Sequence, residues 1–260
     1  MSKWFIRPCK VDIGNMCRKM GINVPLALAL QAKGLNTPKK VKDYFNTENY
    51  SFGDITELIG VKRSFEIIEK AINENKKIFI YGDYDVDGVT STVILYKSLK
   101  ALGANVFYYI PNRVTDGYGL NVNAIERLIG KGMELLITCD NGIAAIEEIK
   151  YAKEKGIDVV IYDHHEPVIK DDKEILPEAD SVTDAKIENC GYDFTVMCAG
   201  GLCYRVMKSF YEYLGQKYTL EKEMIIFAGI ATVCDVVDLV GENRAIAKRS
   251  LELINDNIEN

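Results

Sequence analysis

Between residues 77 and 162 the chain alternates short apolar runs with longer segments of helical periodicity. Four apolar runs are typical of buried strands: 77–82, 104–110, 133–139 and 157–162. The segments between them, near 89–102, 121–131 and 143–155, are typical of helices. Strands that alternate with helices predict an α/β fold, a parallel sheet with right-handed crossovers and helices on both faces. In such folds the functional residues gather beyond the carboxyl ends of the strands.

The regions on either side of this segment have helical patterns only. The first 75 residues favour short helices near 24–34, 38–46 and 57–74, and the last part of the chain favours helices near 198–215, 220–234 and 244–258. Thr37, which precedes Pro38, fits a helix N-cap. We therefore expect a small N-terminal helical region over 1–75, packed on the core of an α/β domain over 76–260.

The composition narrows the class of protein. A net charge of −6 argues against a passive nucleic-acid binder, which is usually basic, but it does not exclude an enzyme that acts on nucleic acid. No apolar stretch reaches the roughly 18–20 residues that cross a bilayer, and the first residues lack the apolar segment of a signal peptide. The seven cysteines include no Cys-x-x-Cys pair, and several lie in apolar surroundings (Cys139, Cys198, Cys203, Cys234). We expect reduced core cysteines, no membrane association and a cytoplasmic location.

Only two histidines occur in the chain, and they stand next to each other in Asp163-His164-His165. They follow directly after the apolar run 157–162. Imidazole and carboxylate together suit a transition-metal site. Neighbouring residues on a strand point to opposite faces, so both histidines can serve one site only if the chain turns at this point. The alternative is a chance pair in a surface turn.

Other strand ends carry carboxylates too. The run 77–82 is followed by three aspartates at alternating positions, Asp83, Asp85 and Asp87, and the run 133–139 is followed by Asp140. Like charges so close together repel one another unless a cation neutralises them, so we expect a metal site. An EF-hand is excluded because position 12 of its loop, counted from Asp83, would be Ile94 rather than a glutamate. A phosphate-binding loop is excluded because no Gly-Lys-Ser/Thr follows.

Asp235 is a further acid in an otherwise apolar segment, 228–237. We expect it to be largely buried, and buried carboxylates are normally paired or bound to metal. The alternative is a helix cap or a salt bridge to Arg244.

Four segments taken in order resemble the motifs of the DHH phosphoesterase superfamily. They are Gly82-Asp83-Tyr84-Asp85-Val86-Asp87-Gly88, Cys139-Asp140-Asn141-Gly142, Asp163-His164-His165 and Val233-Cys234-Asp235-Val236-Val237. Their form is most similar to the RecJ branch of single-strand exonucleases. Branches that hydrolyse pyrophosphate or cyclic dinucleotides usually have a histidine where this chain has Tyr81.

The resemblance implies a phosphodiesterase with two divalent ions, Mn²⁺ or Mg²⁺, that acts on single-stranded DNA in repair and recombination. The implied metal ligands are Asp83, Asp85, Asp87, Asp140, His164 and Asp235. The implied catalytic residues are Asp140, His164, His165 and Asp163, of which Asp163 orients a histidine, and His165 binds the scissile phosphate or donates a proton to the leaving oxygen. The implied substrate-binding residues are Arg113, His165 and Tyr118. A single-strand-binding protein or a helicase would be a partner.

Some features leave other interpretations open. Arg113 would also fit a plain surface salt bridge. Tyr84 or Tyr118 would stack on a base, pack in the core or simply be exposed. Asp238 stands where RecJ proteins often have proline, and Thr183-Asp184-Ala185-Lys186 replaces a common Asn-Pro-Lys segment. One alternative function is hydrolysis of short oligonucleotides, cyclic dinucleotides or pyrophosphate by another type of DHH enzyme. The other is a non-catalytic scaffold, although such relatives lack some of the acids that this chain keeps.

Overall fold

The computed structural model describes residues 12–47, 50–113 and 119–258, and it divides the chain into two compact units, Met1–Tyr50 and Ser51–Asn260. The division falls after residue 50, whereas the sequence led us to expect it after residue 75. The 3₁₀ turn η1 (Ile55–Glu57) and helix α4 (Val61–Asn73) account for the difference, because their apolar side chains belong to the main core of the second unit.

The first unit holds three short helices, α1 (Ile13–Met20), α2 (Val24–Ala32) and α3 (Pro38–Phe45). They enclose a small core of Met16, Ala27, Leu30 and Val41. Thr37 caps α3 as expected, since its hydroxyl accepts a hydrogen bond from the Lys40 N–H at 3.2 Å. Helix α1 was not expected from the sequence.

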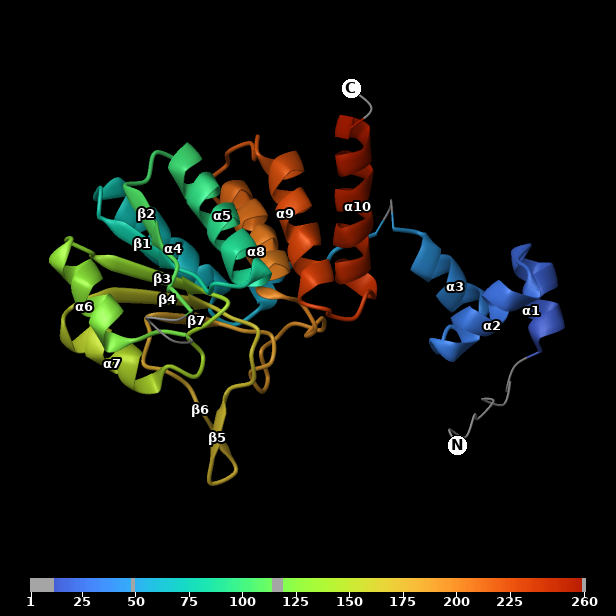
Figure 1. Ribbon diagram of the computed structural model, residues 1–260, viewed down its shortest axis with the longest axis horizontal. Coiled ribbons are helices and arrows are strands. Elements are labelled where there is room, and N and C mark those ends of the chain that lie inside the picture. Colours follow the sequence, from blue (N-terminus) through green and yellow to red (C-terminus); the bar gives the residue numbers. More distant parts are fainter. Residues whose placement is uncertain (1–11, 48–49, 114–118, 259–260) are drawn as a thin grey trace. The chain divides into compact units, whose positions relative to one another are not determined.

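The second unit is built on a five-stranded parallel sheet with the order β2-β1-β3-β4-β7 (Figure 1). The strands are β1 (Ile78–Tyr81), β2 (Val106–Tyr109), β3 (Leu135–Cys139), β4 (Asp158–Tyr162) and β7 (Ser181–Thr183). Four of them are the four expected strands. Strand β7 was missed because it has only three residues, too few for a periodicity to show. The expected parallel α/β sheet is confirmed.

Helices cover both faces of the sheet, as expected (Figure 1). Alternate strand residues, such as Ile78, Ile80 and Val160, pack on one face with α4, α5 (Val86–Ala101), α8 (Ala199–Tyr213) and α9 (Glu221–Cys234). The intervening residues, such as Phe79 and Leu136, pack on the other face with α6 (Val122–Gly130) and α7 (Ile146–Glu154). Helix α10 (Gly241–Ile258) packs on α9.

The strand order creates a switch point beside β1. From β1 the chain runs to β2 on one side, and it then returns to β3 on the other side. In open parallel sheets a crevice forms at such a point, beyond the carboxyl ends of the strands. The sheet order therefore places the ends of β1 and β3 where a site is expected.

The exposure of Cys234 and a short antiparallel hairpin were not expected from the sequence. Cys234, the last residue of α9, is exposed rather than part of the core, although Ala231 and Thr232 in the same helical turn are fully buried. An antiparallel hairpin of β5 (Val168–Lys170) and β6 (Lys173–Ile175) follows the histidine pair, and the sequence did not predict it. Among the described residues, every helix is too short or too polar to cross a membrane.

Candidate metal centre

The expected carboxylates and the histidine pair come together at the carboxyl edge of the sheet. Asp83 follows β1, Asp140 follows β3, and residues 163–165 follow β4. Asp140 has a left-handed backbone with φ of 63°, and Gly142 has φ of 116°. These two residues turn the chain sharply, so that the Asp140 side chain stays over the strand ends.

The aspartates after β1 are held by a tight strand-to-helix turn. Asp85 is the N-cap of α5, and its Oδ1 accepts a hydrogen bond from the Gly88 N–H at 2.9 Å. This cap starts the helix at Val86, a few residues before the position expected from the sequence. A Cβ at Gly88 would lie 2.5 Å from the backbone nitrogen of Asp83, so only glycine allows this turn to close.

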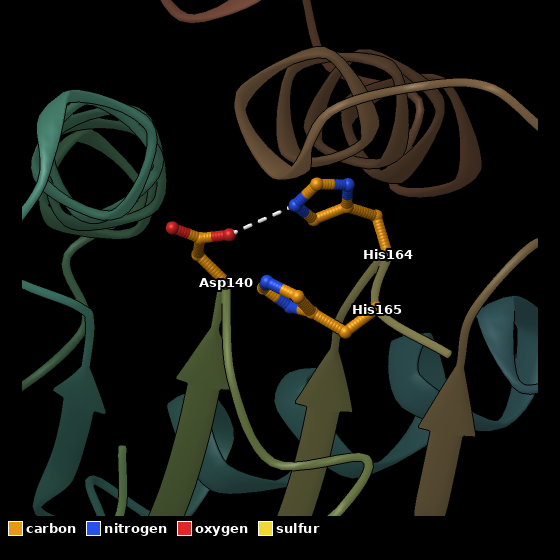
Figure 2. A group of neighbouring side chains, drawn as sticks. All are labelled: Asp140, His164 and His165. Atoms are coloured by element: carbon orange, nitrogen blue, oxygen red, sulfur yellow. Dashed lines mark hydrogen bonds and ion pairs between the residues drawn. The ribbon is translucent and has the colours of Figure 1, made fainter. Parts of the chain in front are cut away.

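His164 lies at the centre of three carboxylates. Its Nε2 is 3.1 Å from Asp140 Oδ1 and 3.5 Å from Asp87 Oδ2. Its Nδ1 is 3.8 Å from an oxygen of Asp235, the C-cap residue of α9. Figure 2 shows the Asp140 carboxylate facing the His164 ring across the ends of the strands. One imidazole thus bridges acids that come from the end of β3, from α5 and from the end of α9.

Asp87 is also bound to the first turn of α8. Its Oδ2 accepts a hydrogen bond from the Ala199 N–H at 2.8 Å, and its Oδ1 accepts one from the Gly200 N–H at 2.7 Å. The N–H groups of a first helical turn have no partner within their own helix. Asp87 therefore joins α5 to α8, and its carboxylate is fixed in orientation.

Asp163 contacts the second histidine of the pair. Asp163 Oδ1 is 2.7 Å from Nδ1 of His165, and Oδ2 accepts a hydrogen bond from the Ile143 N–H at 2.9 Å. The two contacts fix the position of the His165 ring relative to the turn after β3. His165 and Asp163 also line a cavity of about 310 Å³, together with Asn141 and residues 142–145.

The pKa values in the site reflect burial of many like charges. Burial, reinforced by the Asp87 charge, raises the pKa of Asp140 to about 10. Burial also raises the pKa of Asp87 and of Asp235, which is less completely enclosed. Asp163 behaves differently: burial acts to raise its pKa, but hydrogen bonds from His165 and from backbone N–H groups lower it below the usual value. The hydrogen bond to Asp163 in turn raises the pKa of His165.

These residues fit divalent cations. Three groups have ligand atoms within 4.8 Å of one another: Asp83, Asp85 and Asp140; Asp87, His164 and Asp235; and Asp140, His164 and His165. Asp83 Oδ1 is buried without a hydrogen-bond partner, which costs free energy unless a ligand reaches it. A cation would remove both this penalty and the repulsion that raises the pKa of Asp140. Carboxylate oxygens with one or two imidazoles suit Mn²⁺ or Mg²⁺ rather than a thiolate-bound metal.

Asp235 and Asp184 lie differently from what the sequence suggested. Asp235 reaches the site, but its side chain keeps 25% of its exposure, so it is half-buried rather than largely buried. Asp184 follows β7 and is 0% exposed, and it adds a carboxylate that was not among the expected site residues. The Asp163 N–H donates to the Thr183 carbonyl at 3.0 Å, which places Asp184 beside Asp163. The same strand-end rule would have identified Asp184 if β7 had been recognised.

The substrate-binding candidates are placed in part. The Arg113 guanidinium lies over the Tyr84 ring, 5.4 Å from its centroid, and Arg113 is exposed. Tyr84 directly follows Asp83, so this pair lies at the same edge of the sheet as the acids. Tyr118 lies outside the described residues.

The fold and the site define a class: an α/β protein with an acidic, histidine-containing centre for divalent cations at the carboxyl edge of a parallel sheet. The family described as "DHH family, N-terminal domain" matches residues 77–232. The chain belongs to this family.

Relatives and solved structures agree with this assignment. The single-stranded-DNA-specific exonuclease RecJ of Bacillus subtilis is 37% identical over 251 residues, which cover 96% of this chain and 30% of the relative. A crystal structure of exonuclease RecJ bound to manganese has a TM-score of 0.67 at 31% identity and covers 75% of this chain and 48% of its own. RecJ from Thermus thermophilus in complex with Mn²⁺ has a TM-score of 0.73 at 25% identity and covers 94% of this chain and 33% of its own. The chain thus spans about a third of the length of the curated relatives it matches.

Proposed function

We propose that this chain carries the catalytic centre of a RecJ-like exonuclease, which hydrolyses single-stranded DNA in the 5′ to 3′ direction during repair and recombination. The observation that supports this most strongly is the convergence of acids from three parts of the chain on His164, in a member of the DHH family. The similarity to exonucleases called single-stranded-DNA-specific favours that substrate class over cyclic dinucleotides or pyrophosphate.

Two divalent ions, Mn²⁺ or Mg²⁺, would be held by carboxylates and one histidine. The proposed ligands are Asp83, Asp85, Asp87, Asp140, His164 and Asp235. RecJ structures contain either of these metals. When bound, the ions would supply positive charge for the phosphate oxygens and lower the pKa of a water that attacks phosphorus.

The residues around the ions have separate tasks in this proposal. Asp163 holds the His165 ring through Nδ1, and this contact raises the pKa of the imidazole, which favours the form that also carries a proton on Nε2. His165 would give this proton to the leaving oxygen or bind the scissile phosphate. Arg113 would contact a phosphate with its guanidinium, and the Tyr84 ring beneath it would hold that guanidinium in position.

We also propose a cellular location and partner proteins for this chain. All six cysteines among the described residues are free thiols, which favours the cytoplasm, where thiols stay reduced. A single-strand-binding protein or a helicase would be a partner, because each one produces or covers the proposed substrate.

The test is hydrolysis by the 260-residue chain and by its Asp140→Ala variant in Mn²⁺. Single-stranded DNA, the same DNA as a duplex, short oligonucleotides, a cyclic dinucleotide and pyrophosphate form the substrate panel. We expect turnover of single-stranded DNA by the parent chain and none by the variant, while circular dichroism shows an intact fold. Glu178→Ala removes an exposed carboxylate outside the site and should keep full activity. Parent-like turnover by the Asp140→Ala variant would reject the metal assignment, and preference for another substrate of the panel would reject the exonuclease.

A further inference from the structure

Strand β2 forms one edge of the sheet and carries two exposed aromatic side chains. Phe107 is 43% exposed and Tyr108 is 59% exposed. Each ring packs on an inner aromatic side chain: Phe107 stacks on Phe79 with centroids 5.1 Å apart, and Tyr108 meets Tyr96 edge-on at 5.3 Å. The packing holds both rings in place, so the exposed aromatic surfaces need little further ordering to receive a flat ligand.

Three lysines surround these rings. Lys77, Lys100 and Lys131 line a hollow of about 350 Å³ together with Phe107 and Tyr108, and no acidic side chain among the described residues lines it. Lys77 Nζ donates a hydrogen bond to the Lys131 carbonyl at 3.1 Å, which ties the start of β1 to the segment after α6. Within the described part of the chain, none of the three lysines forms an ion pair with a carboxylate. The hollow is therefore a local positive site on a chain whose net charge is −6.

Basic and aromatic side chains continue from this hollow toward the catalytic edge. Tyr109 is the next residue of β2, and its hydroxyl accepts a hydrogen bond from an Arg127 nitrogen at 2.7 Å. Beyond the end of the strand lies Arg113, over the ring of Tyr84. At about 3.3 Å per residue, the roughly six residues from Phe107 to Arg113 span at most about 20 Å. We call this series, from Lys100 and Lys131 to Arg113, the β2-edge track.

We propose that the β2-edge track binds the part of a single-stranded nucleic acid substrate that lies outside the catalytic centre. This inference rests on the proposed function for the identity of the substrate. Lysine ammonium groups neutralise phosphates, and exposed rings stack with bases of any sequence, which together give tight binding without sequence preference. Phe107 and Tyr108 project from opposite faces of β2, so the aromatic contacts flank the edge rather than fill it. A peptide strand added to that edge would use the backbone groups of β2 and would need neither lysine nor ring.

The test compares two double variants that each remove two positive charges. Lys100→Ala with Lys131→Ala removes charge from the track, and Lys62→Ala with Lys70→Ala removes charge from α4, which packs beside β7 at the opposite edge of the sheet. Fluorescence anisotropy without divalent cations would measure binding of labelled single strands of about 4 and about 16 nucleotides, the range of site sizes in single-strand binders. Each measurement is repeated over a series of salt concentrations.

We expect the track variant to bind the longer strand about tenfold more weakly than the parent chain and to lose about 0.7 from the salt slope for each phosphate contact removed. Tyr108→Ala should weaken binding of the same strand about fivefold through lost base stacking, with the salt slope unchanged. Hydrolysis of the shorter strand should stay at the parent level, since the catalytic centre is untouched. The α4 variant should match the parent chain.

The proposal is overturned if the track variant and the α4 variant share the affinity and salt slope of the parent chain. It is also overturned if an acidic peptide occupies the track without competing with the single strand. Failure of the proposed function looks different: the chain would then bind the longer strand through Lys100 and Lys131 but hydrolyse no strand of any length in Mn²⁺.

Discussion

Asp184→Asn should make the protein more stable at neutral and alkaline pH. Asp184 is 0% exposed, and only one of its oxygens is engaged, by the Lys186 N–H at 2.8 Å, while the other oxygen is buried without a partner. Burial, followed by the repulsion of Asp163, raises the pKa of Asp184 from 3.8 to about 7. The folded state binds the proton of Asp184 more tightly than the unfolded chain does. The stabilisation that this protonated carboxyl group contributes is therefore fully present below about pH 4 and is lost as the pH rises to about 7.

The pKa difference sets the size of the effect. About three pKa units at about 1.36 kcal/mol each correspond to about 4 kcal/mol lost by the parent chain above about pH 7. Asparagine never ionises and keeps the bond from Lys186, but its buried NH₂ group costs about 1–3 kcal/mol if it finds no acceptor. We therefore expect Asp184→Asn to raise the free energy of unfolding by about 1–3 kcal/mol at about pH 8, and to be neutral or destabilising near pH 4.

Urea unfolding of the metal-free chain from about pH 4 to about pH 8 measures this effect. The other carboxyl groups of the site contribute to the pH dependence of both proteins, so their contribution cancels when the free energy of unfolding of the parent chain is subtracted from that of the variant. Asp193→Asn is a matched control, since Asp193 is exposed. A difference between the Asp184→Asn variant and the parent chain that stays constant with pH would refute the burial argument.

Three other substitutions test the way the site is built. Gly88→Ala should destabilise the chain by about 1–3 kcal/mol, because the new Cβ would meet the backbone of Asp83 at 2.5 Å. It should also weaken Mn²⁺ binding measured by calorimetry, and an unchanged Mn²⁺ affinity would contradict the tight turn. Glu242→Ala should lower the free energy of unfolding, measured with urea, by about 3–5 kcal/mol. The substitution leaves the Arg205 guanidinium buried without the carboxylate that now lies 3.0 Å away, and a loss under about 1 kcal/mol would contradict that ion pair. Asp163→Asn should lower the pKa of the His165 imidazole, and NMR can follow this pKa because the chain has only two histidines. An unaltered titration of His165 would contradict the orienting role of Asp163.

The alternation of strands and helices predicted most of the fold, because strands buried on both faces are continuous apolar runs. The strands β1 to β4 and the helices between them lie where the pattern placed them, with ends shifted by a few residues. The cap at Asp85 explains one such shift, since a side-chain hydrogen bond and not hydrophobic periodicity decides where α5 begins. Strand β7 was missed because its three residues are too few to show a pattern. Only their pairing with β4 defines them as a strand, and β4 is distant in the sequence.

The candidate site followed from the same reasoning, with clear limits. The rule about carboxyl ends of strands brought Asp83, Asp140 and His164 together without further information. The sequence could not show that Asp87 is bound by the first turn of α8, because that contact joins residues far apart in the chain. Nor could it show which histidine Asp163 holds, since the choice depends on how the chain leaves β4.

The central claim is that distant carboxylates and one imidazole form a single centre for two divalent cations. An anomalous-scattering map from crystals soaked in Mn²⁺ tests it most directly. We predict two peaks, one among Asp83, Asp85 and Asp140 and the other among Asp87, His164 and Asp235. A map without a peak at this edge of the sheet, or with one tetrahedral site that leaves no position for water, would contradict the account.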